Sequence, residues 1–378
     1  MAGIYIHIPF CRKACNYCNF HFTTNLSMVD EMVEGIKKEI KMRLDFFSDK
    51  NIETIYFGGG TPSILNQRHY SEIFSLLEKH YIIEKNAEIT MEANPEDVDN
   101  NFIGKLKGLP FNRFSLGAQS FHEDDLIWMN RNHNHSQAIE SIKRLQDAQY
   151  INLNLDLIYG YPLLTQKKWA SNLDRFFSLE IPHLSSYAMT VEPKTALGHL
   201  VAKGKASEMD DNQTAEQFNY LLNQISENGY EQYEISNFSK PENNAIHNTN
   251  YWLKKPYLGI GPGAHSYIDG QRRWNLENNS KYLKGVNLGD KYWGEEILTP
   301  CDVANESIMT SIRTKWGCNL DSLYSLTKNL DTKNFKKSID KLANKGHLKI
   351  VDNTLFLTQE GKLFADAIAA ELFFEDQL

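Results

Sequence analysis

The stretch that decides the fold is residues 4–18, IYIHIPFCRKACNYC. It joins an apolar run of strand length to three cysteines, Cys11, Cys15 and Cys18. A strand followed by a loop lets three thiols face one point, and soft thiolate ligands suit iron-sulfur clusters. Structural zinc would need four protein ligands, usually as two pairs, and no second pair follows at a suitable spacing. The stretch therefore predicts a metal cluster with one open coordination position.

The alternative for these cysteines is plain packing, or a disulfide with one thiol left over. Thiols this dense are readily oxidised when no metal holds them, so the cluster is favoured. Cys301 and Cys318 stand alone and are interpreted as packing residues. This cysteine usage fits a reducing compartment. Since the chain shows no basic-then-apolar leader and no run of about 18 apolar residues, we expect a cytoplasmic protein.

The spacing C-x3-C-x2-C directly after the first strand resembles the radical S-adenosylmethionine (SAM) enzymes. The words YIHIPFC at 5–11, NYC at 16–18 and GGGTP at 58–62 resemble one branch of that family. This branch contains the oxygen-independent coproporphyrinogen III oxidases and their heme-chaperone relatives. The resemblance implies a [4Fe-4S] cluster on the three cysteines, with SAM on the fourth iron. One departure stands out, because the oxidases carry a fourth cysteine two residues after the third and this chain has Phe20 there.

Apolar runs of strand length alternate with helical patterns along the first half of the chain, which predicts a parallel sheet. The predicted strands are Gly3–Ile8, Thr54–Phe57, Glu88–Glu92, Arg113–Leu116, Asn152–Ile158 and Leu184–Met189. The predicted helices are Met28–Phe46 with Ser27 as N-cap, Gln67–Lys79, Asn101–Lys107, Ser136–Gln149 and Gln166–Phe177. Six such units, together with the family resemblance, predict an α/β fold built on an incomplete (β/α)6 barrel.

Candidate ligand contacts fall at the carboxyl ends of the predicted strands, where such barrels carry their sites. The loop Gly58–Gly60 lets backbone approach a ligand closely, although a bland sharp turn would look similar. Glu92, Gln119 and Asp156 recur at or near the ends of successive strands, although each alone could merely cap a helix or satisfy a loop amide. By resemblance the glycine loop holds the SAM amino group. The residues that resemblance assigns to the SAM pocket are Tyr5, Gly59, Gly60, Thr61, Glu92, Gln119, Arg131, Asp156 and Ala188.

Residues 247–252, HNTNYW, gather a histidine and two large aromatics, followed by a glycine-rich run to His265. Such a mix predicts a flat apolar pocket with an axial nitrogen ligand, which is what heme needs. The alternative is a packed seam between domains with satisfied histidines. The word H-N-x-x-Y-W resembles the heme-chaperone branch, so His247, Tyr251 and Trp252 are our heme candidates. The histidines kept as lesser contributors are His7, His21 and His265.

From about Pro300 the pattern changes to three helical segments, a hairpin around Asp352-Asn353 and a final helix, which predicts a small α+β winged-helix-like domain. Its central helix is expected at Ser338–Gly346, after a polar helix at Ser207–Glu227 upstream. We divide the chain into 1–200 (partial barrel), 201–298 (barrel extension with the HNTNYW segment) and 299–378 (C-terminal domain). Seven lysines lie between Lys328 and Lys349, and the only acidic residues in the same span are Asp331 and Asp340. A solvated face explains them, with nucleic-acid binding as the less favoured alternative.

The 378 residues carry a formal net charge of −8, which argues against nucleic acid as the main partner. Two functions remain. The first is a carrier that holds a [4Fe-4S] cluster, SAM and heme, and passes heme to client proteins. The second is a coproporphyrinogen III oxidase-type radical SAM oxidoreductase. Phe20 favours the carrier. The resemblance leaves room for a homodimer, an electron donor if SAM is cleaved, and peripheral contact with membranes through clients.

Overall fold

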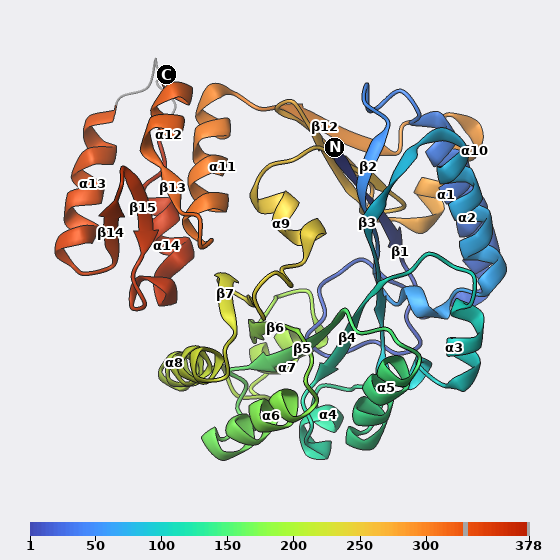
Figure 1. Cartoon of the computed structure of the whole chain (residues 1–378), viewed down its shortest axis with the longest axis horizontal. Coiled ribbons are helices and arrows are strands. Elements are labelled where there is room, and N and C mark those ends of the chain that lie inside the picture. Colours follow the sequence, from blue (N-terminus) through green and yellow to red (C-terminus); the bar gives the residue numbers. More distant parts are fainter. Residues whose placement is uncertain (328–331, 376–378) are drawn as a thin grey trace.

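The structure is a computed structural model of the whole chain, and it describes residues 1–327 and 332–375. Among these residues, twelve strands form one mixed sheet in the order β12-β11-β10-β9-β1-β2-β3-β4-β5-β6-β8-β7. Strands β1 to β6 pair in parallel, and helices cover their outer side (Figure 1). The sheet is curved but not closed, so the α/β fold with an incomplete barrel of six strand-helix units is confirmed.

All six predicted strands are present, most with longer bounds. They are β1 (Ala2–Ile8), β2 (Asn51–Gly59), β3 (Ile82–Ala93), β4 (Arg113–Gln119), β5 (Leu153–Tyr159) and β6 (His183–Ala188). Their residues are mostly buried, as expected for strands covered on both faces. The carboxyl ends of these strands gather at one edge, where the candidate site lies.

The helices that follow these strands also match the prediction, with shifted ends. They are α1 (Val29–Met42), α2 (Gln67–His80), α3 (Asn100–Leu106), α5 (His135–Asp147), α6 (Gln166–Ser178) and α8 (Asp211–Glu227). Ser27 as N-cap was wrong. A short 3-10 turn, Leu26–Met28, precedes α1, and the Asn25 side chain accepts the Ser27 backbone N–H. Two short helices, α4 (Glu123–Trp128) and α7 (Ala196–Ala202), were not predicted, because neither is long enough to show a helical repeat.

Sequence periodicity also missed how the chain continues the sheet beyond the six units. β9 (Tyr257–Ile260) pairs in parallel with β1 on the side opposite β2, and β10 (His265–Ile268), β11 (Gln271–Asn275) and β12 (Trp293–Ile297) extend it in antiparallel fashion. At the other edge, β8 (Asn237–Ser239) pairs with β6, and β7 (Glu231–Glu234) pairs with β8. Helix α10 (Asn279–Leu288) packs on α1. These strands of three to five residues are too short to be recognised by alternation alone.

Helix α9 (Ile246–Trp252) carries the HNTNYW word and contacts β2 on one side and α11 (Pro300–Ile312) on the other. Figure 1 shows it in the middle of the view, between the strands and the C-terminal helices. Its amino end is held by Glu88, whose carboxylate accepts the backbone N–H groups of Ile246 and His247 at 2.9 Å each. Since Glu88 lies on β3, the HNTNYW motif is fixed to the inner surface of the open barrel.

The C-terminal segment builds its own hydrophobic cluster from side chains of residues 301–374. It contains α11, α12 (Leu320–Leu326), α13 (Thr332–Asn344), α14 (Ala365–Glu371) and a three-stranded sheet of β13 (Cys318–Asn319), β14 (Leu348–Val351) and β15 (Thr354–Leu357). The predicted hairpin is present, with Asp352 and Asn353 both at positive φ, as a tight two-residue turn requires. Cys301 and Cys318 are buried in this cluster, so their assignment as packing residues is confirmed.

Two members of the lysine-rich run, Lys328 and Asp331, lie outside the described residues. The predicted central helix is the second half of α13, which begins at Thr332. Within residues 1–327 and 332–375, no helix combines the length and the apolar character needed to cross a bilayer.

Candidate functional site

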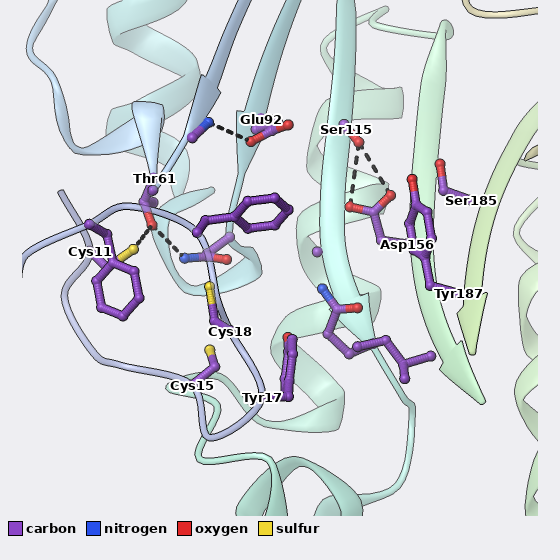
Figure 2. A pocket seen from close by; sticks show the side chains of 18 of the residues that line it. Cys11, Cys15, Tyr17, Cys18, Thr61, Glu92, Ser115, Asp156, Ser185 and Tyr187 are labelled. Atoms are coloured by element: carbon purple, nitrogen blue, oxygen red, sulfur yellow. Dashed lines mark hydrogen bonds between the residues drawn. The ribbon is translucent and has the colours of Figure 1, made fainter. Parts of the chain in front are cut away.

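The cysteine loop leaves β1 and is closed at its base by the backbone of Thr23. The Cys11 N–H donates to the Thr23 carbonyl at 3.0 Å, and the Thr23 N–H donates to the Pro9 carbonyl at 2.9 Å. Further out, Asn16 ties the loop to the end of α4, since its side-chain amide donates to the Trp128 carbonyl at 2.7 Å. These bonds hold residues 11–18 over the carboxyl ends of the strands, where Figure 2 shows the three sulfur atoms on one side of the cavity.

Two of the three sulfurs accept hydrogen bonds from the barrel. The Thr61 hydroxyl donates to Cys11 Sγ at 3.4 Å, and Arg131 Nη1 donates to Cys15 Sγ at 3.3 Å. Burial raises the pKa of the Cys11 thiol to about 12, while the Thr61 hydroxyl opposes that rise. Burial also raises the pKa of Cys18. All three cysteines are free and line the cavity.

The donor set fits a cluster better than a single ion. Among the described residues, no three side chains of His, Cys, Asp or Glu come close enough together to hold one metal ion. In a cubane cluster each thiolate binds its own iron, so three sulfurs around a shared cavity are what such a cluster needs. The hydrogen-bond donors from Thr61 and Arg131 would stabilise thiolates here.

The cavity beside the cysteines has a volume of about 340 Å³. The predicted SAM residues that line it are Gly59, Gly60, Thr61, Glu92, Gln119, Arg131, Asp156 and Ala188. The structure thus brings eight of the nine predicted residues to one cavity. Tyr5 does not line it, because its ring stacks on Tyr56 and its hydroxyl lies 3.2 Å from His7 Nδ1.

The glycine loop needs its glycines for two separate reasons. Gly59 has φ +109, and a Cβ there would lie 2.6 Å from the buried ring of His7. A Cβ on Gly60 would lie 2.5 Å from the Phe10 carbonyl oxygen, and the Gly60 N–H donates to the Ile8 carbonyl at 2.9 Å. The loop is therefore pressed against the strand end that leads into Cys11.

Glu92 and Asp156 face the cavity from β3 and the middle of β5 (Figure 2). Burial raises the pKa of Glu92 to about 7, although the carboxylate accepts hydrogen bonds from the Tyr56 hydroxyl at 2.8 Å and the Gly59 N–H at 3.1 Å. Burial likewise raises the pKa of Asp156 to about 6, with Asn154 donating to it at 2.7 Å. Two partly buried carboxylates on one cavity favour a ligand that carries positive charge, as SAM does at its amino and sulfonium groups.

Arg131 and Gln119 line the cavity beside β4. Arg131 Nη2 donates to the Asn94 side chain at 2.7 Å and to the Gly117 carbonyl, so its guanidinium bridges β4 and the loop after β3. Gln119, the last residue of β4, has φ +68, a left-handed conformation that is costly for a residue with a side chain. Such strain at a strand end is typical of residues held for function.

Several further cavity residues were not predicted: Tyr56, Arg113, Ser115, Asn154, Ser185, Tyr187 and Asn248. A signal for some of them exists in the sequence. Asn154 and Asp156 lie two apart in an otherwise apolar strand, so they share one face, and Ser115 and Ser185 occupy the register positions beside them on β4 and β6. Polar residues inside an otherwise buried strand therefore indicate, from the sequence alone, which residues line the cavity.

The heme candidates lie on α9, outside this cavity. His247 is 2% exposed, and both ring nitrogens are hydrogen-bonded, Nδ1 to Thr54 Oγ1 at 2.7 Å and Nε2 to the Tyr251 hydroxyl at 2.8 Å. Burial lowers the pKa of His247 to about 3. Trp252 is half-buried beneath the Arg313 guanidinium at 5.0 Å. Asn248 alone reaches the cavity wall, which makes α9 a neighbour of the SAM candidates.

The side chains of the lesser histidine candidates also have partners within the protein. His7 is buried, its Nε2 lies 2.9 Å from the His21 carbonyl, and burial lowers its pKa to about 4. His21 Nε2 lies 2.7 Å from Asn279 Oδ1, and the His265 ring stacks on Trp274.

Comparison with known proteins shows which family the chain belongs to. The model of the radical SAM superfamily matches residues 5–175. The heme chaperone HemW of Bacillus subtilis (strain 168) is 30% identical over 97% of this chain and 98% of its own length. That of Buchnera aphidicola subsp. Acyrthosiphon pisum is 31% identical over 97% and 96%. The structure of coproporphyrinogen III oxidase (HemN) from Escherichia coli matches 98% of this chain and 90% of its own, with TM-score 0.86 at 21% identity, which shows a shared fold. The chain therefore belongs to the radical SAM superfamily and, within it, to the HemW family.

Proposed function

We propose that this protein is a heme chaperone that carries a [4Fe-4S] cluster and SAM, binds heme, and passes it to client proteins. The observation that carries the proposal is the near-complete match to proteins named heme chaperone HemW, which extends through the HNTNYW helix and the C-terminal segment. The cavity and α9 lie side by side, because Asn248 of α9 contributes to the cavity wall.

The cluster in this proposal is held by Cys11, Cys15 and Cys18, and SAM occupies the adjoining cavity. When bound, the cluster supplies one-electron chemistry to SAM. The chain's own contribution is to bind and orient: Glu92 and the glycine loop face the amino group of SAM, and Arg131 neutralises charge beside Cys15. Tyr17 and Phe20 line the same cavity and would shield the cluster from water.

Heme in this proposal is bound at α9, with His247 as iron ligand and Tyr251 and Trp252 against the macrocycle. Because His247 is buried and bonded at both nitrogens, ligation must replace its bond to Thr54 or its bond to Tyr251. Because Trp252 packs under Arg313, heme must also displace part of the contact between α9 and the C-terminal segment. Binding heme at α9 is thus coupled to a rearrangement at that contact.

Phe20 argues against the oxidase-type alternative, since it stands at the position of the oxidases' fourth cysteine. Its side chain lines the cavity and carries no sulfur atom. The experiment that tests the proposal is addition of heme to the purified, anaerobically reconstituted protein. We expect a Soret band, and no turnover of coproporphyrinogen III with SAM and a reductant. Turnover without a heme band would reject the chaperone in favour of the oxidase.

The cluster has its own test, which does not depend on heme. We expect Cys11→Ser, Cys15→Ser and Cys18→Ser each to lose most bound iron in a colorimetric assay. Cys301→Ser is the matched control, because Cys301 is buried in the C-terminal cluster away from the loop. Full iron content in Cys15→Ser would remove that residue from the ligand set.

A further inference from the structure

A second cavity lies between the carboxyl end of α1 and the strands β10 to β12. Its volume is about 550 Å³, within the range of small-molecule sites. None of its residues lines the cavity beside the cysteines. We call it the arginine cavity, because three arginines line it together with apolar residues: Arg43, Arg272, Arg273, Phe46, Ile268 and Ile297.

Arg43 brings a buried cation to the arginine cavity. Its side chain is 6% exposed, and Nη2 donates to the Ser266 hydroxyl at 3.4 Å. Nη1 makes no hydrogen bond with any described residue. The carboxylate paired with it, that of Glu39, lies 3.6 Å away and already accepts three hydrogen bonds from other groups. A buried guanidinium nitrogen without an acceptor is costly, so the site lacks an anionic partner at this point.

Arg273 reaches the same cavity from β11. Ser266, which accepts the bond from Arg43, is the register partner of Arg273 on β10, so both guanidinium groups lie on one face of the sheet. Arg273 Nε is buried and makes no hydrogen bond within the described part of the chain. The guanidinium lies over the Trp293 ring at 4.0 Å, a contact that leaves its N–H groups unpaired. Two cations therefore share this face of the cavity.

The acidic residues of the arginine cavity are paired with other cations. Glu295 is opposite Arg273 in the register, but its ion pair is with Lys291 at 3.9 Å. Glu296 accepts a hydrogen bond from Arg272 Nη1 at 2.8 Å. Since side chains alternate along a strand, Arg272 points to the opposite face of the sheet from its neighbour Arg273. The two cations that share a face are thus left with Glu39 as their ion-pair partner among the described residues.

We propose that the arginine cavity binds a small organic anion, with its phosphate or carboxylate head between Arg43 and Arg273. Guanidinium groups offer paired N–H donors that match the oxygens of both heads. The apolar part of the ligand packs against Phe46, Ile268 and Ile297, and it covers some of the Ile297 side chain, which is 79% exposed. This binding does not depend on the proposed heme or SAM binding, because the cavity shares no residue with the cysteine cavity or α9.

The test titrates the full-length protein with inorganic phosphate, phenyl phosphate and benzoate, using isothermal titration calorimetry at constant ionic strength. Inorganic phosphate is the head alone, whereas the other two probes carry either head on the same apolar ring. We expect a ring-bearing probe to bind more tightly than inorganic phosphate, and its head identifies a phosphate or a carboxylate ligand. Arg273→Met should weaken binding about 10- to 100-fold, because it removes charge-assisted hydrogen bonds to the head.

Two further variants separate the head from the apolar part. Arg43→Lys keeps the charge beside Glu39 but loses the paired donors, so it should weaken every probe that binds the parent. Ile297→Ser should weaken the ring-bearing probe and leave inorganic phosphate unchanged. Thermal unfolding without probes checks that each variant is folded.

Arg175→Met is the matched control, because Arg175 is an exposed arginine of α6 outside the cavity. It should bind the probes as the parent does. The site would be overturned if no probe released heat or raised the unfolding temperature of the parent. Equal affinity in Arg273→Met and the parent, or an equal loss in Arg175→Met, would overturn it as well.

Discussion

Arg131 Nη1 donates a hydrogen bond to Cys15 Sγ at 3.3 Å, so a partly buried positive charge lies against one of the three thiols proposed to hold the cluster. Hydrogen bonds and positive charge near the sulfurs favour the reduced cluster. We therefore expect Arg131→Met to make the cluster potential more negative, measured by redox titration followed by electron paramagnetic resonance. Arg144→Met is the control, since Arg144 bonds to Val98 and Glu140 on the outer helices. An unchanged potential in Arg131→Met would separate this arginine from the cluster.

Glu92 should lower the free energy of unfolding at neutral pH and at the same time strengthen SAM binding. Its pKa is raised by burial to about 7 from an ordinary value near 4.5, so the folded protein binds this proton more tightly than the unfolded chain does. Stability from this group is therefore greatest below pH 4.5 and is lost as the pH rises toward 7. We expect Glu92→Gln to have a free energy of unfolding about 1–2 kcal/mol higher than the parent at pH 8, and no higher at pH 4.5, in urea denaturation without SAM.

The same substitution should weaken SAM. The glutamine keeps one acceptor for Tyr56 or Gly59 but brings no negative charge to the amino group. Calorimetry should show weaker SAM binding in Glu92→Gln at pH 8, and weaker binding in the parent as the pH falls below about 7. Unaltered SAM affinity in the variant would place the amino group elsewhere.

The sequence predicts the six-stranded part of the barrel because its strands are long, apolar and separated by amphipathic helices. It predicts the cavity wall for a related reason: a parallel sheet brings the carboxyl ends of its strands together, so Glu92 and Gln119 had to be neighbours. The strands β7 to β12 could not be predicted. They are short, and their place beside β1 and β6 depends on pairing between residues more than 50 positions apart.

The heme candidates show a second limit of the sequence. The word HNTNYW predicts an imidazole beside aromatic rings, and the structure has this arrangement. The motif does not predict that Thr54 and Tyr251 hydrogen-bond to the two ring nitrogens of His247. It also does not predict that the Arg313 guanidinium covers Trp252. Thr54 lies on β2 and Arg313 directly follows α11, and only the folded chain brings them to α9.

Gly60 should be required for the cysteine loop in a way that other glycines are not. A Cβ there would lie 2.5 Å from the Phe10 carbonyl oxygen, which is backbone and cannot turn aside. We expect Gly60→Ala to displace the strand end before Cys11 and to lower the iron content after reconstitution. Gly104→Ala in α3 is the control, because nothing lies within 4 Å of its added methyl group. That variant should gain about 0.5–1 kcal/mol in stability and keep its iron.

The contact between α9 and the C-terminal segment can be measured as a coupling energy. Arg313 lies 5.0 Å above the Trp252 ring, and Lys254 on the same side donates to the Ser307 hydroxyl of α11 at 2.5 Å. Of the two single substitutions, Arg313→Ala should destabilise the protein more than Trp252→Ala. It removes the ion-pair partner of Glu234 and leaves that buried carboxylate unpaired with Arg313.

A double-mutant cycle of Arg313→Ala and Trp252→Ala separates that cost from the contact between the two side chains. We expect a coupling of about 0.5–2 kcal/mol, since the cation lies over the ring at a partly desolvated position. The control cycle uses Lys315 and Trp316, an exposed neighbouring pair at 5.8 Å, which should couple weakly. Saturating heme should reduce the Arg313–Trp252 coupling if the macrocycle takes the place of the guanidinium on Trp252. A coupling that stays the same with bound heme would mean that heme binds without displacing this contact, and that Trp252 does not face the macrocycle.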